Sequence, residues 1–220
     1  TASWEAEDIR YNVIRWTSSP RPPYGGYGPS FVNPRTGEIL GADIMLEFIF
    51  LTNRLPYEKL YDIAALDNMQ PTNNLNYDNC AFGETMHQNI LYGTQLLNAF
   101  GFADLDKDEF LKQALYDLVL HEVGHTFGLM HNFIGSQFHS IQEIQDPVLG
   151  ATVGLTASVM DYTIPNISGD KTKQGLFFDT KPGLYDKWAI QYGYTSIENE
   201  DEEKNALQKI LSESVKKENR

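Results

Sequence analysis

The segment HEVGHTFGLMH, which begins at His121, constrains the fold of this chain more than any other part of the sequence. An apolar stripe at helical spacing leads directly into it, so the segment is predicted to continue an amphipathic helix. His121 and His125 are four residues apart, which places both imidazoles on one face of that helix with about 5–6 Å between their Cβ atoms. Gly128 predicts the end of the helix, because glycine readily adopts the positive φ of a sharp turn. The chain can then bring His131 back towards the same face.

Three histidines at this spacing predict a metal centre. Zinc is bound by imidazole nitrogens at about 2.0–2.1 Å, and three imidazoles with one open position suit this metal. A site with three protein ligands leaves a position for water or substrate, which is the catalytic rather than the structural arrangement. Glu122 follows the first ligand, where its carboxylate can reach a metal-bound water without binding the metal. We therefore expect one catalytic Zn2+ ion held by His121, His125 and His131, with Glu122 as the general base.

The first third of the chain predicts strands. Residues 9–16 show the alternation and the β-branched and aromatic content of a strand. A segment rich in Pro and Gly follows, which forbids a helix and predicts a long loop. Two short strands around a turn at 33–37 are predicted next, and the second strand, about 38–48, is a candidate sheet edge. Between 51 and 80 the pattern is weak and allows one short helix near 57–66.

The rest of the chain predicts helices. Residues 84–100 carry apolar residues among polar ones and finish at Gly101, as a helix with a glycine stop does. A second helix is predicted to begin after Asp106, where Glu109 stands three residues on in a capping-box arrangement. Past the histidine motif the chain is mostly irregular, apart from a short helix within 181–194 and an amphipathic helix in the tail. Strands followed by helices, without repeats or a second domain, indicate the α+β class.

The composition excludes several other classes of protein. With 41% hydrophobic residues the chain can fill one core, and no run approaches the roughly 20 apolar residues of a membrane span. The formal net charge of -13 argues against a nucleic-acid partner, because phosphate binding depends on clustered Lys and Arg. The single cysteine, Cys80, excludes an internal disulfide and a cysteine-rich zinc site. The first residues lack signal-peptide features and an initiator Met, so we expect a processed or excised piece.

Two motifs together resemble the metzincin clan of zinc endopeptidases. The first is HEVGHTFGLMH, and the second, SVMDY at residues 158–162, resembles the Met-turn of that clan. The resemblance implies a catalytic domain with a twisted mixed sheet, an active-site helix and a smaller, mostly irregular C-terminal lobe with a Met-turn and a C-terminal helix. It also implies that Met160 forms an apolar floor beneath the zinc ligands. The Met-x-Tyr spacing is similar to that of astacins and serralysins, which implies that Tyr162 is a switchable extra zinc ligand and stabilises the tetrahedral intermediate.

A poorly characterised family of bacterial zinc-dependent metalloproteases resembles more of the chain. The matching pieces, in order, are DIRYNVIRW, NPRTGEILGADI, HEVGHTFGLMHNF, SVMDY and GLYDKWAIQYGY. This resemblance implies an exported bacterial enzyme that is periplasmic, secreted or on the cell surface. We expect one catalytic domain over residues 1–220, with an upper lobe of about 1–128, a lower lobe of about 129–198 and a helical tail of about 199–220.

One departure from the clan concerns the N-terminal part. Metzincins usually place a long helix between their first two strands, but nothing between Trp16 and Phe31 can form one. We therefore expect that the usual first strand and helix lie upstream of Thr1, and that this chain is the core of a longer protein.

The resemblance also implies how a protein or peptide substrate is held. An extended substrate would pair with the predicted edge strand, a β-augmentation that depends on backbone more than on side chains. The residues expected to contact it are Ala42, Asp43, Ile44 and Met45. The expected reaction is peptide-bond hydrolysis by a zinc-activated water, with the proton taken by the glutamate of the motif and delivered to the leaving amine. The oligomeric state is not predicted.

Two other functions remain open at this stage. In a gluzincin the third zinc ligand is a distant glutamate, for which Glu143 is the candidate, although the second glutamate-bearing helix motif of that group is missing. A zinc-stabilised adhesion or binding module would keep the metal without turnover. The presence of Glu122 argues against such a module, since only catalysis requires it.

A structural Ca2+ ion is unsupported. Asp104, Asp106 and Asp108 have the alternate spacing of a calcium loop. An EF-hand would need Gly and Glu at the positions where this chain has Glu109 and Leu115. Acidic residues at the start of a helix are the simpler interpretation.

Overall fold

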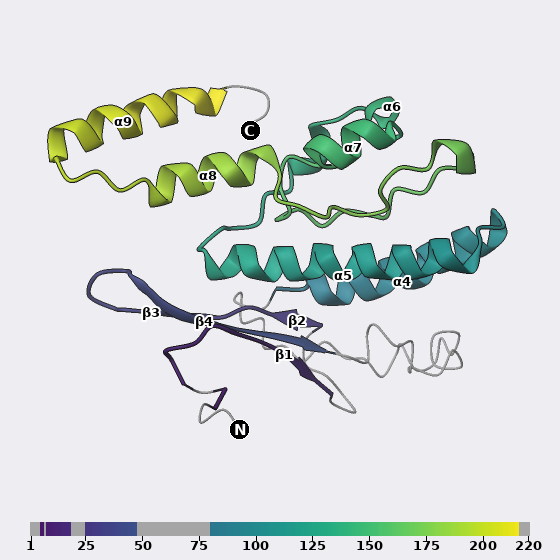
Figure 1. Cartoon of the computed structure of the whole chain (residues 1–220), viewed down its shortest axis with the longest axis horizontal. Helices are drawn as coiled ribbons and strands as arrows, with labels where there is room; N and C mark the ends of the chain where they lie inside the picture. Colours follow the sequence, from purple (N-terminus) through teal and green to yellow (C-terminus); the bar gives the residue numbers. More distant parts are fainter. Residues whose placement is uncertain (1–4, 7, 19–24, 48–79, 216–220) are drawn as a thin grey trace, which may run out of the picture.

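The computed structural model describes residues 5–6, 8–18, 25–47 and 80–215, which form a mixed structure of strands and helices (Figure 1). A small sheet lies on one side of two long helices, and the C-terminal helices lie on the other side (Figure 1). The predicted α+β class is confirmed. The helix predicted near 57–66 lies outside the described residues. No helix within the described residues is long and apolar enough to cross a membrane.

The sheet is built around one long strand. Its strands in the described ranges are β1 (Val13–Thr17), β2 (Gly26–Tyr27), β3 (Ser30–Val32) and β4 (Ile39–Glu47). The two strands predicted around a turn are confirmed as β3 and β4, and Gly37 in that turn has a φ of 77°. The strand predicted from residue 9 begins only at Val13. The preceding residues form a turn in which the Tyr11 N–H donates to the Asp8 carbonyl at 3.0 Å.

The predicted edge position of β4 is wrong. β4 pairs in parallel with β1 on one side and antiparallel with β2 and β3 on the other. In this register Asp43 lies opposite Val13, and Ala42 lies opposite Ser30. Met45 has partners on both sides, while Ile44 pairs with β1. Because strands flank these residues on both sides, an extended substrate cannot pair with them while the sheet stays intact.

Two long helices cover the sheet. α4 (Phe82–Ala99) agrees with the predicted helix and ends before Gly101, whose φ is 69°. α5 (Asp104–Thr126) begins three residues earlier than predicted, and the Asp106 carboxylate accepts the Ala103 N–H at 3.0 Å to cap it. The core between sheet and helices is apolar and includes Ile44, Leu46, Phe82, Met86, Ile90, Leu97, Phe110, Ala114 and Leu118.

The C-terminal part contains short helices joined by irregular segments. Their bounds are η1 (Gly135–Gln137), α6 (Ile141–Ile144), α7 (Pro147–Val153), η2 (Lys171–Lys173), α8 (Leu184–Tyr194), α9 (Glu200–Ser212) and η3 (Glu213–Val215). The short helix and the tail helix predicted from the sequence are confirmed as α8 and α9, which lie side by side (Figure 1). The Trp188 indole N–H donates to the Ile210 carbonyl at 2.9 Å and joins them. The sequence did not predict α6 and α7.

Candidate metal centre

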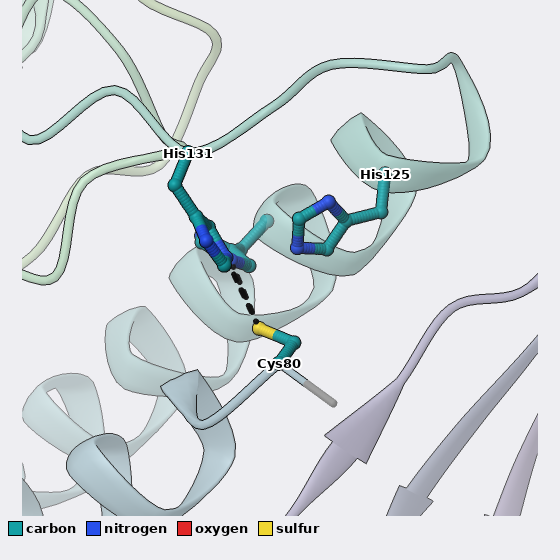
Figure 2. Close-up of side chains that lie close together, drawn as sticks. Cys80, His125 and His131 are labelled. Carbon is teal, nitrogen blue, oxygen red and sulfur yellow. Dashed lines mark hydrogen bonds between the residues drawn. The ribbon is translucent and has the colours of Figure 1, made fainter. Parts of the chain in front are cut away.

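The three predicted histidine ligands converge. His121 and His125 project from the last turns of α5, and Gly128 beyond its end has a φ of 81°, as predicted. The chain then turns and brings His131 back. The ring centroids of the three histidines lie 4.8, 5.3 and 4.8 Å apart, so they form a nearly equilateral triangle. Figure 2 shows the rings of His125 and His131 facing a common centre.

Hydrogen bonds orient two of the imidazoles. The Nδ1 of His121 donates to the Val159 carbonyl at 2.7 Å, and the Nδ1 of His125 donates to the Leu129 carbonyl at 3.1 Å. The opposite nitrogen, Nε2, therefore carries the lone pair that a metal needs. In His125 this Nε2 is buried and has no hydrogen-bond partner in the described part of the chain. An orphaned buried nitrogen in a triangle of imidazoles fits a zinc ligand.

Burial keeps these histidines neutral. It lowers the pKa of His121 to about 3, and the neighbouring His125 charge adds to the shift. Burial also lowers the pKa of His125 and of His131. Neutral imidazole is the form that binds a metal, so the three side chains are prepared for one at neutral pH.

Glu122 lies beside the triangle in a dry environment. Its side chain is fully buried, and neither carboxylate oxygen has a hydrogen-bond partner within the described residues. Burial raises the pKa of Glu122 to about 7. The Gly28 N–H points towards the carboxylate without reaching hydrogen-bond geometry, and it lowers the pKa by a smaller amount. β2 lies directly over this carboxylate, since a Cβ on Gly26 would lie 2.6 Å from the Glu122 Oε1 atom. A larger residue at this position of β2 would displace the Glu122 carboxylate.

Met160 lies directly beneath α5, the helix that carries His121 and His125. Its side chain is fully buried, and a Cβ added to Gly124 would lie 2.3 Å from the Met160 sulfur. Gly124 stands between the two helical histidines, so the thioether packs against the backbone that carries both imidazoles. The Met160 turn is held by Asp186 at the start of α8, whose carboxylate accepts the Ser158 hydroxyl at 2.6 Å and the Val159 N–H at 2.9 Å.

Gly124→Ala should lower the free energy of unfolding, although alanine in a helix interior is normally favoured over glycine by about 0.8–1.0 kcal/mol. The new methyl group would overlap Met160, and overpacking of this kind costs about 1–3 kcal/mol. Gly193→Ala in α8 is the matched control, because its Cβ meets no atom within 4 Å and should stabilise the protein. Thermal unfolding measures both. The double variant Gly124→Ala/Met160→Ala should lose less free energy of unfolding than the sum of the losses in the two single variants. Strictly additive losses would contradict the contact.

Three buried aspartates, Asp117, Asp161 and Asp179, lie near enough to influence one another. Asp117, one turn before the first histidine, is 3% exposed, and its Oδ2 atom has no hydrogen-bond partner in the described chain. Burial raises the pKa of Asp117 well above its usual value, and the charges of Asp179 and Asp161 add to the shift. Asp179 is satisfied by the Leu155 N–H at 2.6 Å and the Thr156 hydroxyl at 2.7 Å, yet burial still raises its pKa to about 6.

Asp117→Asn should stabilise the protein at about pH 8 by about 1–3 kcal/mol, because a buried carboxylate with one unpaired oxygen is replaced by a neutral amide that the charges of Asp179 and Asp161 do not repel. The folded protein binds the Asp117 proton more tightly than the unfolded chain does. The stability linked to that proton is therefore lost as the pH rises through the raised pKa. The advantage of the variant should shrink as the pH falls below about 3.9, the usual pKa of Asp, because Asp117 then becomes protonated in both states. Asp108→Asn, an exposed change on the same helix, should show no such pH-dependent gain in thermal unfolding.

Tyr162 contributes its hydroxyl to the centre. The hydroxyl oxygen lies 3.1 Å from the Nε2 of His131 and accepts the Ala81 N–H at 3.0 Å. The ring packs against Phe82 and Phe133, with centroid separations of 5.1 and 5.2 Å. Burial raises the pKa of Tyr162 far above its usual value, so the hydroxyl stays protonated and can donate.

Cys80 is part of the cluster, although the sequence did not predict this. One ligand atom from each of Cys80, His121, His125 and His131 lies within 4.8 Å of the others. Burial raises the pKa of the Cys80 thiol to about 11, and the Glu122 charge adds to the shift. The inference that a lone cysteine excludes a cysteine-rich zinc site holds, but a single cysteine can still join three histidines. No sequence pattern joins Cys80 to a motif 41 residues away.

Glu143, the gluzincin candidate, lies elsewhere. Its carboxylate accepts the Ser140 N–H at 2.7 Å and caps α6. It does not belong to the cluster of potential ligands found among the described residues. The third imidazole therefore occupies the position that a gluzincin gives to a glutamate.

Comparison with known proteins agrees with this geometry. A family model described as Met-zincin matches residues 103–220, which include α5, the three histidines and the Met160 turn. No curated protein and no solved structure matches the chain. The matched segment covers more than half of the 220 residues and contains every predicted zinc ligand. The resemblance to the metzincin clan is thereby confirmed, and this chain, a zinc metalloprotease in its general class, belongs to the Met-zincin family.

Proposed function

We propose that this protein is a zinc-dependent endopeptidase in which His121, His125 and His131 hold the metal and Glu122 is the general base. The observation that carries the proposal is the buried, unpaired Glu122 carboxylate beside three convergent imidazoles. A carboxylate without partners is costly to bury, so its place next to a metal centre favours a catalytic role.

Each group at the centre has a separate role in peptide hydrolysis. A bound zinc ion supplies Lewis acidity, which polarises a carbonyl and lowers the pKa of a water molecule. Glu122 takes the proton from the attacking water and delivers it to the leaving amine. Its dry surroundings favour this role, because burial makes the carboxylate a stronger base. Tyr162, whose hydroxyl lies beside His131, donates a hydrogen bond to the oxygen that becomes negative.

The substrate must approach along a different strand from the one predicted. We propose that an extended peptide runs along β2, because this strand ends the strand order and lies over Glu122. Phe133 offers an apolar contact beside the centre, since its ring is 60% exposed and lies 5.4 Å from that of His131. We propose that an apolar residue of the peptide packs on Phe133.

A second candidate function is a zinc-stabilised binding module. The observation that favours it is the nearness of Cys80, because a zinc ion with four protein ligands is the structural arrangement. The two candidates differ in turnover. The cleavage assay below therefore separates them.

The test is a cleavage-site profile of the zinc-loaded protein on a mixture of proteome-derived peptides. We expect internal peptide bonds to be cut, activity to vanish on removal of zinc by a chelator and to return when zinc is restored. Glu143→Ala is the control and should keep both metal and activity, because that carboxylate caps α6. Full zinc occupancy without any cleavage, in the wild-type protein and in Cys80→Ala alike, would support the binding module instead.

A further inference from the structure

We propose that the Cys80 thiolate is a fourth ligand of the zinc ion, and that it closes the site in the resting enzyme until water or substrate replaces it. The inference rests on the proposed function, because a closed site matters only to an enzyme that must open it. Figure 2 shows the sulfur of Cys80 directed at the ring of His131, with the ring of His125 nearby.

The start of α4 fixes the position of the sulfur. The Phe82 N–H donates to the Cys80 Sγ at 3.5 Å, and the Ala81 N–H donates to the Tyr162 hydroxyl at 3.0 Å. The fully buried Phe82 ring stacks on His121, with 4.1 Å between ring centroids. Cys80, Ala81 and Phe82 therefore each contact a side chain of the metal centre. These contacts hold the cysteine in place.

The distances match a shared metal ion. The Cys80 Sγ lies 3.3 Å from the Nε2 of His121 and 3.5 Å from the Nε2 of His131. In a tetrahedral site with zinc–nitrogen bonds of about 2.05 Å and a zinc–sulfur bond of about 2.3 Å, the nitrogen–sulfur edge is about 3.6 Å. The distances from the sulfur to two of the three imidazole nitrogens are thus close to the edge of such a tetrahedron.

A simple hydrogen-bond network explains the cluster less well. The sulfur contacts two imidazole nitrogens and, at 3.2 Å, the Tyr162 hydroxyl. A thiol has one proton and can donate to only one of these nitrogens, and it is a weak donor. One cation shared by the sulfur and the imidazoles satisfies all of these lone pairs together. Thiolate is also among the ligands that zinc prefers.

Closure by Cys80 has a chemical consequence. Three nitrogens and one sulfur fill a tetrahedral site, so no position remains for the attacking water or the substrate carbonyl. Opening the site would be a ligand exchange in which the metal–sulfur bond breaks, a bond from the metal to the oxygen of the incoming water or substrate carbonyl forms, and the released thiolate takes up a proton from the buffered solvent. Tyr162, which contacts both the sulfur and His131, can then turn its hydroxyl towards the substrate.

X-ray absorption at the zinc edge of the full zinc-loaded chain tests the ligand directly. We expect one sulfur at about 2.3 Å together with nitrogen ligands in the wild-type protein, and no sulfur in Cys80→Ala. The assignment is clean because the chain has one cysteine, and the variant retains every methionine. Cobalt(II) substitution should give a thiolate charge-transfer band that disappears in the same variant. A wild-type spectrum without sulfur would overturn the proposal.

Peptide cleavage tests the closure. If the open state is populated at 10% or less, removing the thiolate should raise the rate at limiting substrate by about 10-fold or more. Cys80→Ser, which keeps the size of the side chain, should behave like Cys80→Ala and guards against a folding defect in the first variant. Equal activity of wild type and both variants would refute closure, even with sulfur bound. If sulfur is bound to the zinc but none of these proteins cleaves peptides, the proposed endopeptidase activity is refuted. The assignment of Cys80 as the fourth ligand would then remain valid.

Discussion

Glu122→Gln should lower kcat/KM for peptide hydrolysis by about 10²–10⁴-fold while zinc stays bound at full stoichiometry. The amide has the shape of the carboxylate but cannot take a proton from the attacking water. The three imidazoles remain in place, because their orientation depends on the carbonyls of Val159 and Leu129 and on the triangle itself. Steady-state kinetics and metal analysis of the same preparation provide both numbers.

The control for this change is Glu109→Gln on the same helix. Glu109 is exposed and contacts Lys112 and Gln113, so its replacement should leave both turnover and zinc content unchanged. Simultaneous loss of zinc and activity in Glu122→Gln would show that the carboxylate holds the site together. Wild-type turnover in Glu122→Gln would remove Glu122 from the mechanism.

Tyr162→Phe should reduce kcat by about 10²–10³-fold, the usual effect of losing one oxyanion donor, which is worth about 2.7–4 kcal/mol. KM should change little, because the hydrogen bond is made mainly in the transition state. The ring contacts with Phe82 and Phe133 are kept, so a packing role predicts no such loss. The variant should be compared with its parent both in the wild-type chain and in Cys80→Ala, since the hydroxyl also contacts that sulfur.

Tyr92→Phe is the matched control for the second prediction. Tyr92 is 55% exposed on α4, so loss of its hydroxyl should not change kcat. An unchanged kcat/KM for Tyr162→Phe in both backgrounds would falsify the oxyanion role and leave Tyr162 as a packing residue. Zinc affinity should fall only slightly in either case, because the three imidazoles remain.

Features that depend on neighbouring residues could be predicted from the sequence. The helix through His125, the positive φ of Gly128 and the turn at Gly37 follow from local rules about helix spacing and glycine. Element ends were less accurate: α5 begins at Asp104 because the Asp106 carboxylate caps the Ala103 N–H. A cap depends on one side-chain rotamer, and the sequence offered several acids that could provide it.

Features that depend on pairing between distant segments could not be predicted. β4 looked like an edge strand because a strand pattern does not say how many neighbours a strand has. β2 was not recognised, since Gly26 and its neighbours read as a loop, and glycine is there because the Glu122 carboxylate lies 2.6 Å from the position of a Cβ. Asp117 likewise gave no sign that it is buried with other acids.

The sequence by itself determined the spacing of His121, His125 and His131, and hence the prediction of a three-histidine zinc centre, because helix geometry fixes the relation between residues four apart and a glycine allows the return. The tertiary structure alone decided what surrounds that centre. Cys80 reaches it from the start of α4, and β2 covers its glutamate. These arrangements come from packing of segments that are far apart in the chain, whose relative positions depend on the whole core and are not encoded in any local spacing.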